Sequence, residues 1–207
     1  MRIIAGSLRS RKLEAPPGLA TRPTSDRLRE TLFNVLAPRI EGAVFLDLYA
    51  GSGAVGIEAL SRGATRVDFV ERSPAALRVL RGNLEKLGLK AGFRIHAAAV
   101  GATLRRMKAG FEPIPASGPS AEKTPETRFD LVFLDPPYDA AEEYAITLAL
   151  LGNSAACLLA SGALVIAEHR RKQRLEDRCG TLTRTRLLEQ GDAALSFYSV
   201  NAVASPK

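Results

Sequence analysis

Residues Asp135, Pro136, Pro137 and Tyr138 follow directly on the apolar run of residues 131–134. The run is typical of a short buried strand, and turn chemistry explains one Asp-Pro but not an aromatic residue after two prolines. The Asp135 carboxylate and the Pro136 carbonyl could accept hydrogen bonds from an exocyclic amine of a nucleobase. Tyr138 could stack on a base swung out of its helix or loop. We therefore predict that these four residues are catalytic and orient a planar amine for methylation.

A glycine-rich loop in residues 47–60 is a second candidate site. Its Gly51, Gly53 and Gly56 permit a tight turn and let a ligand approach backbone N–H groups closely. The next predicted strand ends at Glu71, where a carboxylate can accept both hydroxyls of a ribose. The pattern predicts a nucleotide-like cofactor, and a dinucleotide and S-adenosylmethionine (SAM) both satisfy it.

Asp47 lies on the predicted strand just before the glycine turn. An acidic residue there could meet the amino acid end of SAM, directly or through water, whereas a dinucleotide would place its pyrophosphate nearby. The alternative is a structural carboxylate that bonds loop amides. The candidate cofactor-binding residues are Asp47, Tyr49, Gly51, Ser52, Gly53, Glu71 and Arg72.

Strands and helices alternate along most of the chain. Strands are predicted at 43–49, 66–71, 93–99, 129–134 and 162–168, with helices at 55–62, 74–87, 101–109 and 140–151. Residues 181–191 and 194–202 alternate around a turn at Gly191, which predicts an antiparallel C-terminal pair. The chain is therefore predicted to be α/β, with a doubly wound, mostly parallel, Rossmann-like sheet whose ligands lie at the carboxyl ends of its strands.

The N-terminal part of the chain differs from this alternation. Residues 1–20 alternate weakly and predict a strand or hairpin, and a helix follows, with Thr24, Ser25 or Asp26 as its cap. We predict a basic, RNA-contacting hairpin and helix at 1–40 and a catalytic domain at 41–207. Residues 113–126 are rich in Pro, Ser and Gly and predict a surface loop within that domain.

Positive charge is concentrated at the N-terminus. The chain has a formal net charge of +7, and residues 1–40 hold eight basic and three acidic side chains. Such an excess favours a polyanionic partner, because basic side chains can neutralise phosphates without reading sequence. The alternative is a solvated charged face, which we also leave open for a second basic cluster at 169–174. The candidate RNA-binding residues are Arg9, Arg11, Lys12, Arg22 and Arg27.

Several functional classes are disfavoured by the composition. Cys157 and Cys179 match neither a metal-ligand spacing nor a disulfide framework, which suits a reducing cytosol. His96 and His169 have no partner at a metal spacing, so no metal site is predicted. No apolar run is long enough for a signal peptide or a bilayer span. We expect a cytoplasmic monomer with no membrane contact.

Four blocks carry a resemblance to a known family. They are RPTSDRLRETLFNVL (22–36), FLDLYAGSGAVGIEALSRGA (45–64), VERS (70–73) and FLDPPY (133–138). Together they resemble the SAM-dependent amino-methyltransferases of nucleic acids. More closely, the chain is similar over nearly its whole length to the bacterial 16S ribosomal RNA guanine-N2 methyltransferases of the small subunit, the Rsm D family.

That resemblance implies a class I SAM-dependent methyltransferase fold, SAM as cofactor, and a guanine in 16S rRNA of an assembling 30S particle as substrate. It also implies that Asp47, Gly51 and Gly53 hold the methionine end of SAM and that Glu71 holds the ribose. One departure stands out. Many methyltransferases carry an acidic residue near the end of the third strand to bind the adenine amine, whereas this chain has only alanines at 97–99. Backbone groups there could serve instead.

Other functions remain open from the residues alone. An adenine-N6 methyltransferase acting on DNA or RNA would use the same tip, since it suits any planar amine. A protein glutamine methyltransferase usually has Asn in place of Asp135. The glycine pattern also permits an NAD-dependent oxidoreductase, although the chain has no candidate catalytic His or Tyr-Lys pair. An RNA-binding module with a vestigial pocket is the last alternative.

Overall fold

An eight-stranded mixed sheet forms the centre of the computed structural model, which describes residues 1–15, 26–110, 128–137 and 140–200. The strands are β1 (Val44–Leu48), β2 (Arg66–Glu71), β3 (Phe93–Ala97), β4 (Phe129–Leu134), β5 (Leu159–Arg170), β6 (Arg178–Cys179), β7 (Leu182–Gln190) and β8 (Ala193–Val200). Their order across the sheet is β3-β2-β1-β4-β5-β8-β7-β6. The first five strands pair in parallel, and β5, β8, β7 and β6 pair antiparallel.

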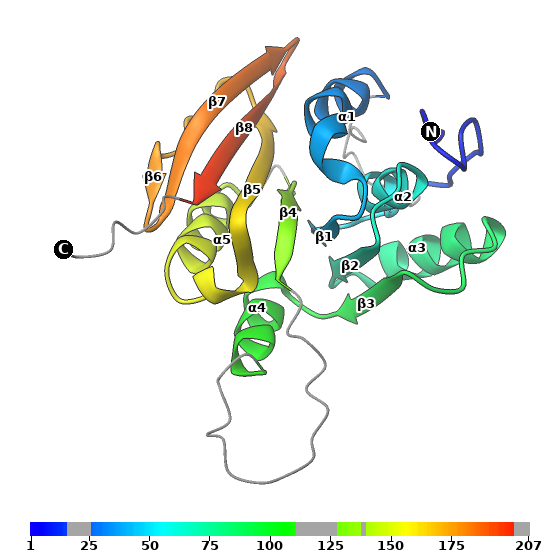
Figure 1. Cartoon of the computed structure of the whole chain (residues 1–207), viewed down its shortest axis with the longest axis horizontal. Coiled ribbons are helices and arrows are strands. Elements are labelled where there is room, and N and C mark those ends of the chain that lie inside the picture. The colour runs from blue at the N-terminus through cyan, green and yellow to red at the C-terminus, as the bar shows by residue number, and fades with distance from the viewer. Residues whose placement is uncertain (16–25, 111–127, 138–139, 201–207) are drawn as a thin grey trace, which may run out of the picture.

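Helices cover both faces of the parallel part of the sheet. They are α1 (Asp26–Ile40), α2 (Ala54–Ser61), α3 (Pro74–Lys86), α4 (Val100–Ala109) and α5 (Glu142–Gly152), with a short 3-10 helix η1 (Ala156–Leu158). Figure 1 shows α1, α2 and α3 on one face, while α4 and α5 lie on the other. Because both faces are covered, every residue of β1 is buried. The predicted doubly wound sheet with an antiparallel C-terminal pair is confirmed.

The clearest local signals in the sequence produce the expected elements. The Ser73 hydroxyl caps α3 by accepting a hydrogen bond from the backbone N–H of Ala76 at 3.4 Å, and Pro74 occupies the first turn. Gly88 follows the helix with φ of +73°. The fifth strand is longer than predicted, since β5 runs from 159 to 170, and the two-residue β6 was not predicted.

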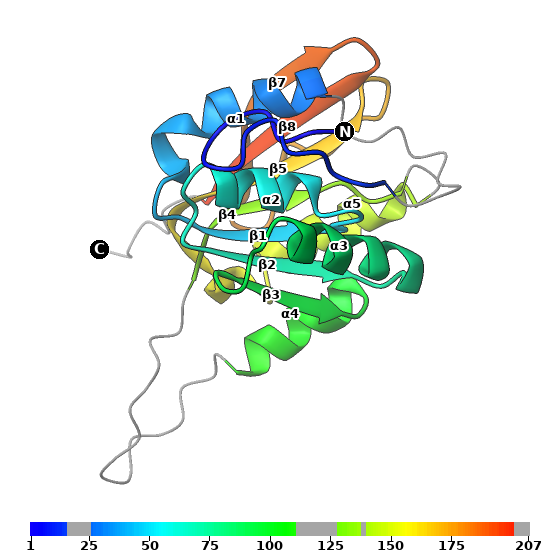
Figure 2. The same cartoon turned by 90° about the vertical axis from the view of Figure 1, so that its right-hand side faces the viewer.

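The predicted N-terminal hairpin is short, with one β-bridge between Arg2 and Lys12. Its two arms pair through the N–H groups of Ile3 and Leu13, which donate to the carbonyls of Arg11 at 3.0 Å and Met1 at 3.1 Å. Other backbone groups of the hairpin find partners on α2. The N–H groups of Ile4 and Ala5 donate to the Glu58 carboxylate at 2.8 and 3.0 Å. Figure 2 shows this N-terminal segment lying against α2. The hairpin is therefore paired within itself and also bound to a helix.

A buried charged network holds the N-terminal segment in place. Glu58 is fully buried, and its carboxylate lies 2.7 Å from Nε of Arg62 and 3.9 Å from Nε of Arg29. Arg29 is also fully buried and pairs with Asp26 at 2.9 Å. Residues of the first forty, such as Ile3, pack in the same hydrophobic core as α2 and β2. The predicted boundary at residue 40, between the RNA-contacting segment and the catalytic domain, therefore stays a functional prediction. It does not mark a break in the hydrophobic core.

No helix within the described ranges is long and apolar enough to cross a bilayer. Both histidines take part in structural hydrogen bonds. His96 Nε2 lies 3.0 Å from Oδ2 of Asp68, and the buried His169 places Nε2 2.8 Å from the Ser196 hydroxyl.

Candidate active site

A cavity of about 610 Å³ opens at the carboxyl ends of the four strands β3, β2, β1 and β4. Its volume is within the range of small-molecule sites. Each of these strands contributes at least one lining residue at or just beyond its end: Ala98 after β3, Glu71 on β2, Asp47 on β1 and Asp135 after β4. The parallel sheet thus brings the glycine loop and the Asp135 tip, which are far apart in sequence, into one cavity.

Gly51 and Glu71 are joined directly. The Gly51 N–H donates to Glu71 Oε2 at 2.8 Å, and the Ser73 N–H donates to Oε1 at 2.7 Å. These bonds use two of the roughly four lone-pair sites of the carboxylate, which leaves capacity for ligand hydroxyls. Gly51 has φ of +57°, and a Cβ at this position would meet only the Tyr49 carbonyl oxygen, at 3.9 Å. Its open side therefore faces the cavity.

Gly53 and Gly56 lie against side chains of the core. Gly53 does not line the cavity, its φ is +80°, and a Cβ there would stand 2.3 Å from Leu80 Cδ1. A Cβ on Gly56 would stand 2.3 Å from Phe69 Cε1. Any side chain would force α2 away from β2 and α3. The close approach of the core therefore requires glycine at 53, and a contact of its backbone with the cofactor stays a prediction.

Asp47 bonds a loop amide and also lines the cavity. The carboxylate is almost fully buried, its Oδ2 accepts a hydrogen bond from the Gly56 N–H at 2.9 Å, and the residue lines the cavity. Burial raises the pKa of Asp47 to about 7, with a smaller contribution from the charge of Glu71, and the Gly56 bond opposes the shift. The group is therefore partly protonated near neutral pH before a cation binds.

Asp135 sits at the end of β4 with Pro136 and Pro137, and all three line the cavity. Burial raises the pKa of Asp135 well above its usual range, and the charges of Glu168 and Asp47 add to the effect. The Asp135 carboxylate therefore lies at the cavity close to two further buried carboxylates, Asp47 and Glu168.

The remaining predicted residues divide into two groups. Tyr49, Ser52 and Arg72 line the same cavity. The predicted residues Tyr138 and Arg22 lie outside the described residues, as do the loop at 113–126 and the alternative caps Thr24 and Ser25.

Two charged residues of the cavity were missed by sequence reasoning. Glu143, in the first turn of α5, accepts a hydrogen bond from the Tyr49 hydroxyl at 2.8 Å and lines the cavity. Arg105 reaches the cavity from α4. Neither belongs to a recognisable motif, and the only available signal was the position of their helices, which follow the ends of β4 and β3.

The charged groups of the cavity fit SAM. Four carboxylates and two arginines line it. An ammonium and a sulfonium centre both favour carboxylate surroundings, and Glu71 has acceptor capacity for ribose hydroxyls. The four carboxylates are Asp47, Glu71, Asp135 and Glu143, and the arginines are Arg72 and Arg105.

A doubly wound sheet with such a cavity at its carboxyl edge is the fold expected of a SAM-dependent methyltransferase. The chain belongs to the family described as Conserved hypothetical protein 95, whose model matches residues 1–199. The cofactor is SAM.

Proteins of similar sequence and structure support the assignment to the methyltransferases. "Ribosomal RNA small subunit methyltransferase D" of Haemophilus influenzae is 39% identical over 156 residues, which cover 74% of this chain and 72% of the relative. The solved structure of yhhF from Escherichia coli is 32% identical with a TM-score of 0.77, covering 97% of this chain and 98% of that one. SMU.776, solved with S-adenosylhomocysteine (SAH), is 13% identical with a TM-score of 0.63 over 83% of this chain and 49% of that one, and shows the shared fold alone. The oxidoreductase alternative is set aside.

Proposed function

We propose that this methyltransferase modifies the exocyclic N2 amine of a specific guanine in 16S rRNA of the small (30S) subunit. The observation that carries the proposal is the acceptor-rich tip Asp135–Pro136, which lies at the end of β4, beside β1, and opens into the cofactor cavity. The name of the Haemophilus influenzae relative supports ribosomal RNA of the small subunit as the substrate.

The tip suits the chemistry of an aromatic amine, whose lone pair is delocalised into the ring. Such a nitrogen becomes nucleophilic when it turns pyramidal. The Asp135 carboxylate and the Pro136 carbonyl can accept its two N–H groups and direct the lone pair toward the methyl donor. Pro136 and Pro137 have no N–H, and the Pro137 carbonyl already accepts a bond from Ala140 at 2.9 Å. The remaining groups of the tip are therefore acceptors, as an amine requires.

The residues at the ends of β1 and β2 are proposed to bind the cofactor. When bound, SAM supplies a methyl group activated by its sulfonium centre. We assign the amino acid end to Asp47 and to the backbone of Gly51, and the ribose to Glu71. Tyr49, whose hydroxyl is held by Glu143, and the neighbouring Ser52 and Arg72 complete the wall. Stacking of Tyr138 on the target base stays a prediction.

Nucleoside mass spectrometry tests the proposal directly. Purified protein and isotopically labelled SAM would be incubated with 30S particles and with naked 16S rRNA, both from a strain that lacks the corresponding gene. We expect labelled N2-methylguanosine in 16S rRNA from at least one of these substrates. Labelled N6-methyladenosine would instead support the adenine alternative, and the absence of labelled nucleoside in both substrates would reject an rRNA substrate.

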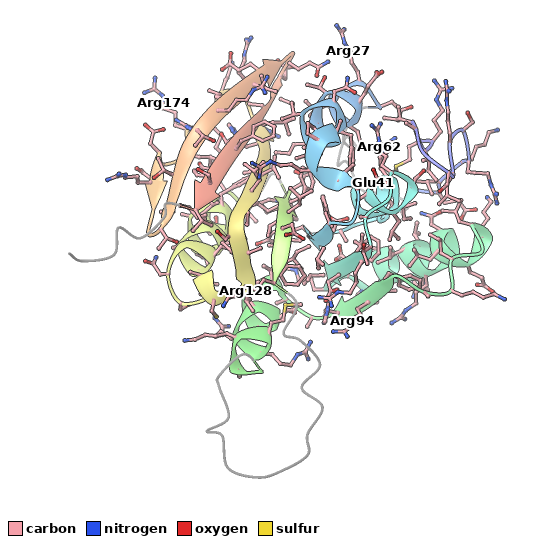
Figure 3. All side chains as sticks on the ribbon, viewed as in Figure 1. Arg27, Glu41, Arg62, Arg94, Arg128 and Arg174 are labelled. Atoms are coloured by element: carbon pink, nitrogen blue, oxygen red, sulfur yellow. The ribbon has the colours of Figure 1, made fainter. Side chains whose placement is uncertain are left out.

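The surface around the N-terminal segment is suited to phosphate. Arg9, Arg11 and Lys12 are exposed, and Arg11 is positioned by a hydrogen bond from Nη2 to the Lys86 carbonyl at 3.0 Å. Figure 3 shows Arg27 extending outward from α1. Arg174 of the second basic cluster also points outward, from the turn that follows the carboxyl end of β5. We assign the N-terminal group to rRNA binding.

Replacing Arg9, Arg11 and Lys12 with Ala is expected to weaken rRNA binding and to flatten its dependence on salt, because fewer counterions are released. The affinity for SAM should not change. The measurement is a titration of 16S rRNA at several salt concentrations.

The matched control replaces Arg81, Lys90 and Arg94 with Ala, which removes the same charge from exposed positions on α3, on β3 and in the loop between them. The rRNA affinity of the control should depend on salt concentration as steeply as that of the wild type. If the salt dependence falls equally in both variants, the effect comes from net charge and not from the N-terminal segment.

The affinity for SAM is expected to rise with pH between 6 and 7. Asp47 must be ionised to hold a cation, and its pKa in the free protein is raised to about 7. Below this value each pH unit should weaken binding by up to about tenfold, and above it the dependence should level off. Calorimetry across this range tests the prediction, with Asp47→Asn as the control. If the SAM affinity of Asp47→Asn depends on pH as steeply as that of the wild type, Asp47 does not contact SAM.

A further inference from the structure

The end of the cavity beyond β3 is lined by backbone and small side chains. Ala98 and Ala99 follow β3, and Gly101 and Ala102 lie in the first turn of α4. The residue before the helix, Ala99, makes no side-chain cap, and the first turn contains no acidic residue. The first N–H groups of a helix have no partner within the helix. Here the side chains of the first turn do not supply one either, and the helix end meets the cavity.

Arg105 adds further donors at the same place. Its Nη1 and Nη2 atoms lie 3.5 and 3.6 Å from the point where a Cβ on Gly101 would stand. The guanidinium therefore folds back over the first turn of α4, and both residues line the cavity. A guanidinium carries five N–H donors and no acceptor. Among the described side chains at this end of the cavity, none is a carboxylate, amide or hydroxyl acceptor.

The order of the strands assigns this end to the purine ring of the cofactor. Glu71 on β2 is assigned to the ribose, Asp47 on β1 to the amino acid end, and β3 lies on the far side of β2 from β1. We propose that the purine is recognised here through its hydrogen-bond acceptors alone, so that the cavity accepts a 6-oxo purine nearly as well as the 6-amino purine of SAM. The inference rests on the proposed placement of the cofactor but not on the identity of the methylated base.

The chemistry of the two rings explains the expected tolerance. Adenine offers N1 as an acceptor beside its amine, whereas hypoxanthine carries a hydrogen on N1 and offers O6 as the acceptor in place of the amine. A site with several N–H donors, some of them on the side chain of Arg105, can bond N1 of adenine or O6 of hypoxanthine once. A carboxylate at this edge would hold the amine and repel O6, because a site built to hydrogen-bond one group strongly rejects an analogue that lacks it. Ala98, which lines the cavity, provides no such acceptor.

Calorimetric titration of the full chain with SAH and with S-inosylhomocysteine tests the inference without any turnover. We expect the two dissociation constants to differ by less than about tenfold. A preference for SAH of tenfold or more would overturn the inference and would mean that a backbone carbonyl near residues 97–99 accepts the amine. Failure of SAH itself to bind would instead reject the placement of the cofactor in this cavity.

A gain-of-selectivity variant sharpens the test. Ala98→Asp introduces the missing acceptor and should shift the preference toward SAH by about tenfold or more. Ala98→Asn is the control of matched size, because its amide can turn either a donor or an acceptor toward the ring, and its preference should stay near that of the wild type. Thermal melting confirms that both variants fold. An unchanged preference in a folded, SAH-binding Ala98→Asp would show that the purine does not lie at this edge.

Discussion

Asp135→Ala is expected to lower the single-turnover rate of methyl transfer by about a hundredfold or more, while the affinity for SAM changes little. The carboxylate is proposed to bond the amine as its nitrogen turns pyramidal and gains positive character, so its contribution belongs mainly to the transition state. The measurement is single-turnover transfer to 30S particles at saturating SAM. A fully active Asp135→Ala enzyme would show that Asp135 does not orient the amine.

Asp135→Asn is the conservative partner of this variant. It keeps an acceptor but loses the charge, so its rate should lie between those of the wild type and Asp135→Ala. A purely structural Asp135 would bond loop amides, and its loss would lower stability and SAM affinity together. We expect instead that neither substitution lowers the stability of the fold. Because burial and nearby carboxylates raise the pKa of Asp135, its charged form is disfavoured in the folded protein, and the melting temperature of either variant should be unchanged or higher.

Gly53→Val is expected to destabilise the fold strongly. Valine is strained at φ of +80°, and its Cβ would stand 2.3 Å from Leu80 Cδ1 in the core. Backbone strain and overpacking each cost about 1–3 kcal/mol, which is a large part of the roughly 5–15 kcal/mol that stabilises a typical domain. Thermal melting and far-UV circular dichroism would measure the loss. A Gly53→Val protein that melts like the wild type but fails to bind SAM would restore the ligand-approach explanation.

Gly51→Asn is the matched control for this glycine loop. Asn tolerates the left-handed conformation that Gly51 adopts, and the space beside Gly51 is open. This variant should keep the fold, while its side chain enters the cavity and weakens SAM binding. The pair separates the two requirements for glycine within one motif, since calorimetry should report on Gly51 and melting on Gly53.

The elements of the parallel sheet could be predicted because their signals are local. The helix α3 follows from a capping serine, a proline in its first turn and a glycine after its end, and all of these act within a few residues. The buried strands β1 and β4 follow from short apolar runs. Alternation of such elements favours one topology, which also predicted that the tip at Asp135 lies beside the glycine loop.

The roles of single residues within these elements depended on partners distant in sequence. The N-terminal hairpin is held against α2 by Glu58, more than fifty positions away. Glycine is needed at position 53 because the side chain of Leu80 lies over it. Close approach of a ligand would also require glycine there. The motif alone therefore did not distinguish packing of the core from binding of a ligand. Glu143 and Arg105 joined the cavity only through the placement of their helices.

The sequence by itself determined the class of fold, the cofactor edge of the sheet and the acceptor-rich tip, because periodicity, caps and proline act through neighbouring residues along the chain. Only the tertiary structure decided which glycine has an open side toward the cavity, how far burial raises the pKa of Asp47, and that the end of the cavity beyond β3 has no acidic residue in the first turn of α4. Each of these properties depends on the atoms that surround a group in space, and in this protein those atoms come from strands and helices that only folding brings together.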